Sequence, residues 1–98
     1  MSLGLNSHSE PSHKNNRERI IQLLINEIVF LGNCYQKAKN QIGRRYIKNA
    51  GYKLQKVLVK QQKQKQKNVI LPYDEYQKSM MFIYQTIEDV VNKIAKII

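Results

Sequence analysis

Three stretches of this 98-residue chain repeat apolar residues at intervals of three and four, which is the spacing of one face of an α-helix. The stretches cover about residues 16–42, 44–66 and 74–98, and short connections join them. Each apolar stripe needs another apolar surface to cover it, and short connections make consecutive helices antiparallel. The pattern therefore predicts an all-α fold, an up-down antiparallel bundle of three long helices.

The three stripes differ in width. Ile20, Ile25, Val29 and Phe30 widen the first stripe, and a helix that is apolar around most of its girth is usually central in a bundle or shared with another subunit. A chain of this length also builds only a small core, so we expect a homo-oligomer that associates through this helix. The second stripe is the narrowest, so its helix is expected to lie outermost. The stripe residues are Ile21, Leu24, Ile28, Leu31, Tyr35, Ala38 and Ile42; Ile47, Ala50, Leu54, Val57 and Leu58; and Tyr76, Met80, Ile83, Ile87, Val90, Ile94 and Ile97.

Polar and glycine residues indicate the helix ends. Either Asn15 or Asn16 can cap the first helix, and Gly43 is expected to end or bend it. Asp74 followed by Gln77 resembles a capping box for the third helix. Residues 1–15 are polar and lack an apolar period, so they are predicted to be a flexible lead-in to a single domain at 16–98.

An alternative remains open for the middle of the chain. A break at residues 49–51 would allow residues 54–59 and 69–71 to pair as a β-hairpin, but apolar and polar residues alternate poorly there and fit the helical period better. In the helical interpretation, Gly51 allows a close approach of two helices, and the run after residue 59 frays. Val69, Ile70 and Leu71 then pack on the bundle as an apolar plug.

The net charge of +10 is concentrated in one block of the chain. Residues 37–67 contain eleven Lys or Arg and no Asp or Glu, whereas residues 1–36 are neutral and residues 68–98 carry a net charge of −1. Such a block attracts polyanions, chiefly nucleic acid, and it lacks the salt-bridge pattern of an ordinary solvated helix. The residues predicted to bind nucleic acid are Arg44, Arg45, Lys48, Tyr52, Lys53, Lys56, Lys60, Lys63 and Lys67.

Two features of this block have alternative interpretations. Tyr52 either stacks on an exposed base or simply covers the stems of neighbouring lysines. The Lys-Gln alternation at 60–67 is either a tail that follows phosphates or a flexible linker. In both cases, contacts from the cations would go to phosphates and would carry little sequence preference.

The sequence contains no pattern typical of an enzyme, a metal site or a cofactor site. His8 and His13 have no third ligand nearby in the sequence, and Cys34 lies beside an apolar stripe without a basic neighbour on its helical face. The acidic residues are explained by capping and solvation. There is neither a signal peptide nor an apolar run long enough to cross a membrane, so we expect a cytoplasmic, non-enzymatic protein without a membrane contact.

One ordered set of positions extends over most of the chain: Tyr46, Ala50, Gly51, Leu54 and Leu58, followed by a basic stretch, then Leu71, Pro72, Tyr76 and a closing helix that ends in residues 93–97. In these positions the chain, from Arg17 onward, resembles the accessory variability proteins of diversity-generating retroelements, which belong to a larger group of small four-helix-bundle proteins. The family's first helix is missing here, and Asn92 and Lys93 replace its usual glycine and tryptophan.

The resemblance implies a truncated four-helix bundle that forms a ring-shaped homo-oligomer, binds RNA or DNA and assists a partner reverse transcriptase. A shorter similarity, over residues 69–76, is to Phd/YefM-type antitoxins, and it requires the hairpin interpretation. A third possibility is a helical protein-interaction module whose charge only gives solubility.

Overall fold

The computed structural model describes residues 13–97, which form three α-helices and contain no strand. The helices are α1 (His13–Lys37), α2 (Gln41–Gln66) and α3 (Tyr73–Ile97). The all-α fold with three long helices is therefore confirmed, and the hairpin interpretation of residues 54–71 is wrong. Residues 1–12, which make up most of the expected lead-in, lie outside the described part of the chain, and residues 13–15 belong to α1.

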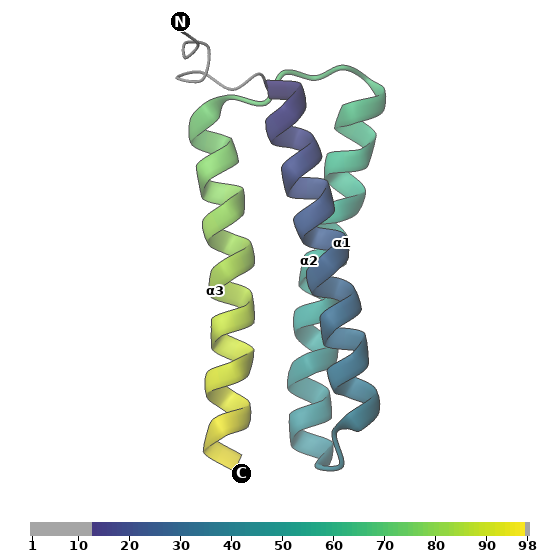
Figure 1. The fold of residues 1–98 in the computed structure, drawn as a ribbon, viewed down its shortest axis with the longest axis vertical. Helices are drawn as coiled ribbons and strands as arrows, with labels where there is room; N and C mark the ends of the chain where they lie inside the picture. Colours follow the sequence, from purple (N-terminus) through teal and green to yellow (C-terminus); the bar gives the residue numbers. More distant parts are fainter. Residues whose placement is uncertain (1–12, 98) are drawn as a thin grey trace, which may run out of the picture.

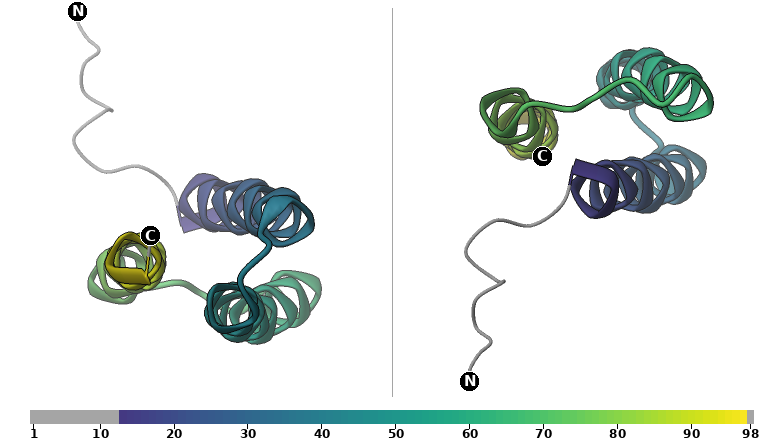
Figure 2. Two further views of the ribbon diagram at one scale, coloured as in Figure 1. Left: turned by 90° about the horizontal axis from the view of Figure 1, so that it is seen from below. Right: turned by 90° about the horizontal axis from the view of Figure 1, so that it is seen from above.

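The helices lie side by side along the long axis of a molecule that measures 53 × 30 × 20 Å. Figure 1 shows the chain descending through α1, returning upward through α2 and descending again through α3. In the end-on views of Figure 2 the helices occupy the corners of a triangle, with α3 to one side of the α1–α2 pair. The contact between α1 and α2 is the most extensive, and the contact between α1 and α3 is the smallest.

The expectation that the second helix lies outermost is wrong, because α2 makes the most extensive contacts of the three helices. More of the surface of α2 is buried than its narrow apolar stripe indicated. The stripe continues into the glutamine-rich end of α2, where Gln61 is buried by polar contacts with α1. The helix that packs least is α3.

Apolar side chains from all three helices form one core between them. Most stripe residues are buried or half-buried as predicted. Ile42 is exposed because it belongs to the first turn of α2 and not to α1, and Ile21 is half-buried outside the core, where Ile20 is buried instead. Burying one such aliphatic side chain contributes about 1.5–3 kcal/mol to folding. The buried apolar residues are Ile20, Leu24, Leu31, Ile47, Ala50, Leu54, Leu71, Ile83 and Val90.

The connection between α1 and α2 lies earlier than predicted. Helix α1 ends at Lys37, and Asn40 caps α2 because its side-chain oxygen accepts the backbone N–H groups of Ile42 at 2.8 Å and Gly43 at 3.1 Å. Gly43 therefore does not end or bend the first helix. It lies buried in the first turn of α2, where an added Cβ would come within 3.2 Å of the Cδ1 atom of Ile97 in α3.

The start of α1 and the start of α3 also differ from prediction. Helix α1 begins at His13, so Asn15 and Asn16 lie inside its first turn and are not caps. At α3, the Pro72 carbonyl accepts the first helical hydrogen bond, from the Tyr76 N–H at 3.0 Å. Asp74 consequently lies in the first turn, where its negative charge is favourable at the positive end of the helix.

The connection between α2 and α3 turns sharply at Asn68, whose φ of 55° lies in the left-handed region that asparagine tolerates. The Val69 N–H donates to the Gln64 carbonyl at 3.0 Å and so closes the end of α2. Of the three residues expected to form an apolar plug, only Leu71 is buried, whereas Val69 and Ile70 are exposed. The plug prediction is thus correct for Leu71 alone.

Two glycines lie inside helices without a packing reason. Gly32 is in α1 and Gly51 is in α2, and a glycine in a helix interior costs about 1 kcal/mol relative to alanine. A Cβ added at either residue would meet no neighbouring atom within 4 Å. The expectation that Gly51 allows a close approach of two helices is therefore wrong, since both glycines border open space.

Candidate nucleic-acid interface

The predicted binding residues form a continuous basic face along α2. We use this name for Arg44, Arg45, Lys48, Tyr52, Lys53, Lys56, Lys60, Lys63 and Lys67. All of them lie on α2 except Lys67, which caps its end. Every side chain of this set is exposed except that of Arg44, which is half-buried. The face exists because the core residues of α2 occupy the opposite side of the same helix.

The basic face is long enough to contact several phosphates. Arg45 and Lys63 are 18 positions apart in one regular helix, so about 27 Å separates them along its axis. Successive phosphates of one strand in a duplex lie about 3.4 Å apart along the duplex axis. A nucleic-acid strand that follows α2 would therefore pass several of these cations in succession.

The charges of the basic face are not neutralised by acidic partners within residues 13–97. The ion pair found in that range joins Lys65 to Glu18, and Lys65 is outside the basic face. Asp89 of α3 borders a hollow with Lys53 and Lys56, but it makes no ion pair with either lysine. The face therefore presents unpaired positive charge to solvent.

Two tyrosines lie next to cations at the start of the basic face. The Lys48 ammonium lies 5.8 Å from the ring centroid of Tyr52, whose side chain is 53% exposed. The Arg44 guanidinium lies over the ring of Tyr35 in α1, 4.3 Å from its centroid. Tyr52 thus contacts a lysine and still offers exposed ring surface, while Arg44 is held partly toward α1.

A groove runs between α1 and α2 beside these tyrosines. Its apolar part, of about 370 Å³, is bordered by Gly32 and Gly51 and by the buried Leu31 and Ile47. Its polar part, of about 400 Å³, is lined by amide and cationic side chains. Both parts share three lining residues, so they lie side by side, and we describe them together as one groove. The shared residues are Tyr35, Lys48 and Tyr52.

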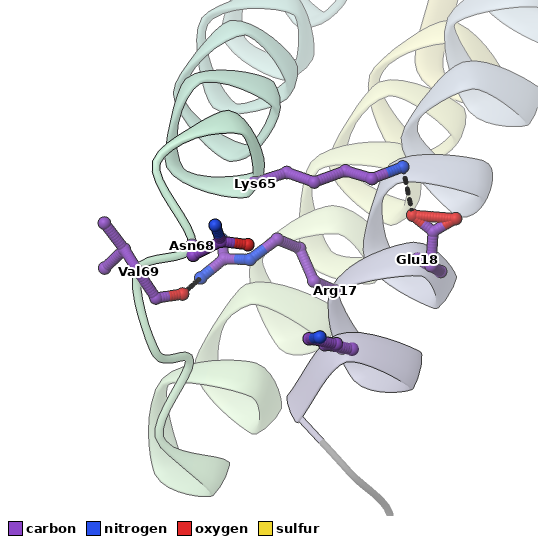
Figure 3. A pocket seen from close by; sticks show the side chains of 6 residues that line it. Arg17, Glu18, Lys65, Asn68 and Val69 are labelled. Carbon is purple, nitrogen blue, oxygen red and sulfur yellow. Dashed lines mark hydrogen bonds and ion pairs between the residues drawn. The ribbon is translucent and has the colours of Figure 1, made fainter.

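A second cluster of polar residues, which the sequence did not indicate as functional, surrounds Arg17 at the other end of α2. Figure 3 shows the Arg17 side chain reaching from α1 toward the turn after α2. The guanidinium donates to the side-chain oxygens of Gln61 at 2.6 Å and Gln64 at 2.9 Å, and to the Val69 carbonyl at 2.7 Å. It therefore ties α1 to both α2 and the following turn.

The Arg17 cluster is buried, with Arg17 only 3% exposed and Gln61 4% exposed. Burial lowers the pKa of Arg17, and the negative charge of Glu75 partly offsets that shift. An arginine stays charged in spite of such a shift, so neutral oxygen atoms hold a buried cation here. Sequence spacing could have revealed part of this arrangement, because Gln61 continues the stripe of Leu54 at an interval of seven residues.

Other kinds of site find little support in the described residues. Within residues 13–97 no three His, Cys, Asp or Glu side chains come together in a way that could hold a metal ion. In the same range, no helix has the length and apolar character needed to cross a membrane. Comparisons with protein-family models, with curated proteins and with solved structures give no match for this chain.

Proposed function

We propose that this protein is a non-enzymatic, nucleic-acid-binding accessory protein and that the basic face of α2 is its binding surface. The observation that carries the proposal is the row of exposed cations over about 27 Å without an ion pair to any acid in the described residues. Exposed, unpaired cations in a row match the charge of a phosphate backbone.

Binding by this face would be mainly electrostatic. Each lysine that contacts a phosphate releases condensed counterions, so affinity falls as salt rises. Contacts to phosphates position the nucleic acid but do not read its bases, so sequence preference would be weak. We therefore assign phosphate contacts to the exposed cations of the basic face, and Arg44 contributes from its edge. The exposed cations are Arg45, Lys48, Lys53, Lys56, Lys60, Lys63 and Lys67.

A charge-reversal variant tests the proposal. The triple variant Lys48→Glu, Lys56→Glu and Lys63→Glu changes exposed side chains only, so far-UV circular dichroism and the Tm should stay close to those of the wild type. In mobility-shift assays with RNA and with DNA, the affinity should fall at least about tenfold, because three phosphate contacts become repulsive. Unchanged affinity would overturn the proposal.

A matched control separates the basic face from net charge. Arg19→Glu, Lys78→Glu and Lys96→Glu make the same change in net charge at exposed positions of α1 and α3. These three side chains make no ion pair in the described structure. The control variant should lose much less affinity than the triple variant of α2. Equal losses would mean that overall charge, and not this face, determines binding.

We further propose that the chain self-associates and works beside a reverse transcriptase. Exposed apolar side chains on α1, including Val29 and Phe30, support an interface with a second copy. The resemblance to accessory variability proteins supports the reverse transcriptase partner. Light scattering of the protein alone tests the first point. A search for a reverse transcriptase gene beside its own, followed by co-purification with the encoded enzyme, tests the second. A monomeric mass or a failure to co-purify would contradict the respective point.

A second candidate function is docking on a partner protein. It is favoured by exposed apolar side chains on α3, namely Met81, Tyr84 and Val91, together with those on α1. The two functions respond differently to salt, because about 0.5 M salt screens exposed charges over a few ångströms but strengthens apolar contacts or leaves them unaffected. A complex that persists at that salt concentration would favour docking. The antitoxin-like alternative loses its basis, since residues 54–71 form no hairpin.

A further inference from the structure

We propose that the groove between α1 and α2 is a binding subsite for one unpaired nucleobase, which gives the protein a preference for single-stranded over duplex nucleic acid. This inference rests on the proposed function and goes beyond it, because the basic face alone would bind phosphates of either form. The groove combines aromatic side chains, cations and open space without an acidic lining residue. The hollow between α2 and α3 also has tyrosines and lysines, but Asp89 lines it as well.

The groove offers a surface on which a base can stack. Tyr35 from α1 and Tyr52 from α2 both border its apolar and its polar part. Tyr52 leaves about half of its side chain in solvent, and the apolar part continues down to Leu31 and Ile47. A planar, weakly polar ring fits such a site, because stacking on aromatic side chains is the usual way in which proteins hold unpaired bases.

The charges around the groove identify the rest of the ligand. Arg44, Arg45 and Lys48 line its polar part, and no acidic side chain lines either part. A base placed between the tyrosines would therefore have its flanking phosphates next to three cations. The amide side chains of Gln41 and Asn49 lie in the same polar part and can both donate to and accept from a base edge. This combination matches a nucleotide and not a purely apolar ligand.

The two helix-interior glycines fit this role. Gly32 borders the groove from α1 and Gly51 from α2, and neither would clash with a neighbour if it carried a side chain. Packing thus gives no reason for glycine at either position. A side chain at either position would extend into the open groove, so the absence of side chains keeps the space free for a base.

Filling the groove tests the inference without changing any charge. Gly51→Leu adds a side chain in the open space, and Gly32→Leu does the same from the other helix if the first variant folds poorly. Binding is measured with a single-stranded oligothymidylate of about ten nucleotides, the same strand with abasic sites, and its duplex with oligoadenylate. Gln85→Leu is the control, because it adds an exposed leucine to α3 far from the groove residues in sequence.

Gly51→Leu should bind the single strand about tenfold or more weakly than the wild type, because it loses one stacked base. Its binding to the duplex should be unchanged. The control Gln85→Leu should bind both ligands as the wild type does. The wild type should also bind the abasic strand more weakly, and the groove variant should no longer distinguish the two strands. If the groove variants bind the single strand as tightly as the wild type, the inference is overturned while the proposed function stands. If the wild type binds neither single strand nor duplex, the proposed function itself fails.

Discussion

Cations have different surroundings on the two sides of α2. On the side that faces α1, at Gln61, the side chain of Arg17 is buried and donates its hydrogen bonds to neutral oxygen atoms. Along the basic face, cations are exposed and lack acidic partners in the described part of the chain. A cation whose donors are saturated by the protein contributes to folding, and a cation left in solvent remains free to bind an anion.

The difference lies in the neighbours of each cation and not in the cation itself. Arg17 points from α1 onto a part of α2 where the stripe position is held by glutamine, so polar atoms meet polar atoms. The cations of the basic face lie on the opposite side of α2, where all of them except Arg44 are exposed. Counting charges would not separate Arg17 from the cations of the basic face. Their burial does, because the buried cation contributes to folding and the exposed cations remain available to an anion.

The largest effect on stability is expected for Arg17→Ala. It leaves the buried side-chain oxygen of Gln61 and the partly buried Val69 carbonyl without their donor, which costs about 2–4 kcal/mol and lowers the Tm by about 10–20 °C. Nucleic-acid affinity, measured well below the Tm, should not change. Thermal melts by circular dichroism and mobility shifts on the same sample check both statements.

A double variant is the control for that loss. In Arg17→Met with Gln61→Leu, the donor and its buried acceptor are replaced by apolar side chains of similar length. The other two acceptors are only partly buried and can bind water, so much of the stability should return. If Arg17→Ala, while fully folded, bound nucleic acid more weakly than the wild type, then the division between a structural and a binding region of α2 would be wrong.

A smaller effect is expected for Glu18→Gln, which removes the ion pair with Lys65. Both side chains are more than half exposed, and exposed pairs contribute about 0–1 kcal/mol, so the Tm should fall by no more than a few degrees. Differential scanning calorimetry at low salt would measure the change. A loss as large as that of Arg17→Ala would show that the exposed pair, and not the buried cluster, holds this end together.

Much of the fold could be predicted from the sequence because apolar spacing reports directly on buried helix faces. Each stripe has a fully buried residue, as expected: Leu24, Leu54 and Ile83. Helix ends were less predictable, since they depend on which polar side chain reaches a free backbone N–H group. Asn40 does so at the start of α2, whereas Gly43 was expected to end or bend the first helix. The spacing of apolar residues does not show which polar side chain caps a helix.

The candidate site was predictable in part. The exposure of the basic face follows from helix geometry once the buried side of α2 is known. The groove could not be predicted from helix geometry, because it depends on which residues of α1 lie opposite Gly51, and tertiary packing determines that. The Arg17 cluster was missed for a related reason, as Gln61 and Gln64 belong to a run whose composition is typical of a solvated segment.

The most direct test of the central claim is the salt dependence of binding to duplex DNA, measured for the wild type and for the Lys48→Glu, Lys56→Glu and Lys63→Glu variant. If about six cations of the basic face contact phosphates, the slope of log affinity against log salt should be about −5 in the wild type and about −2 to −3 in the variant. A wild-type slope near zero, or the same slope in both proteins, would contradict the account.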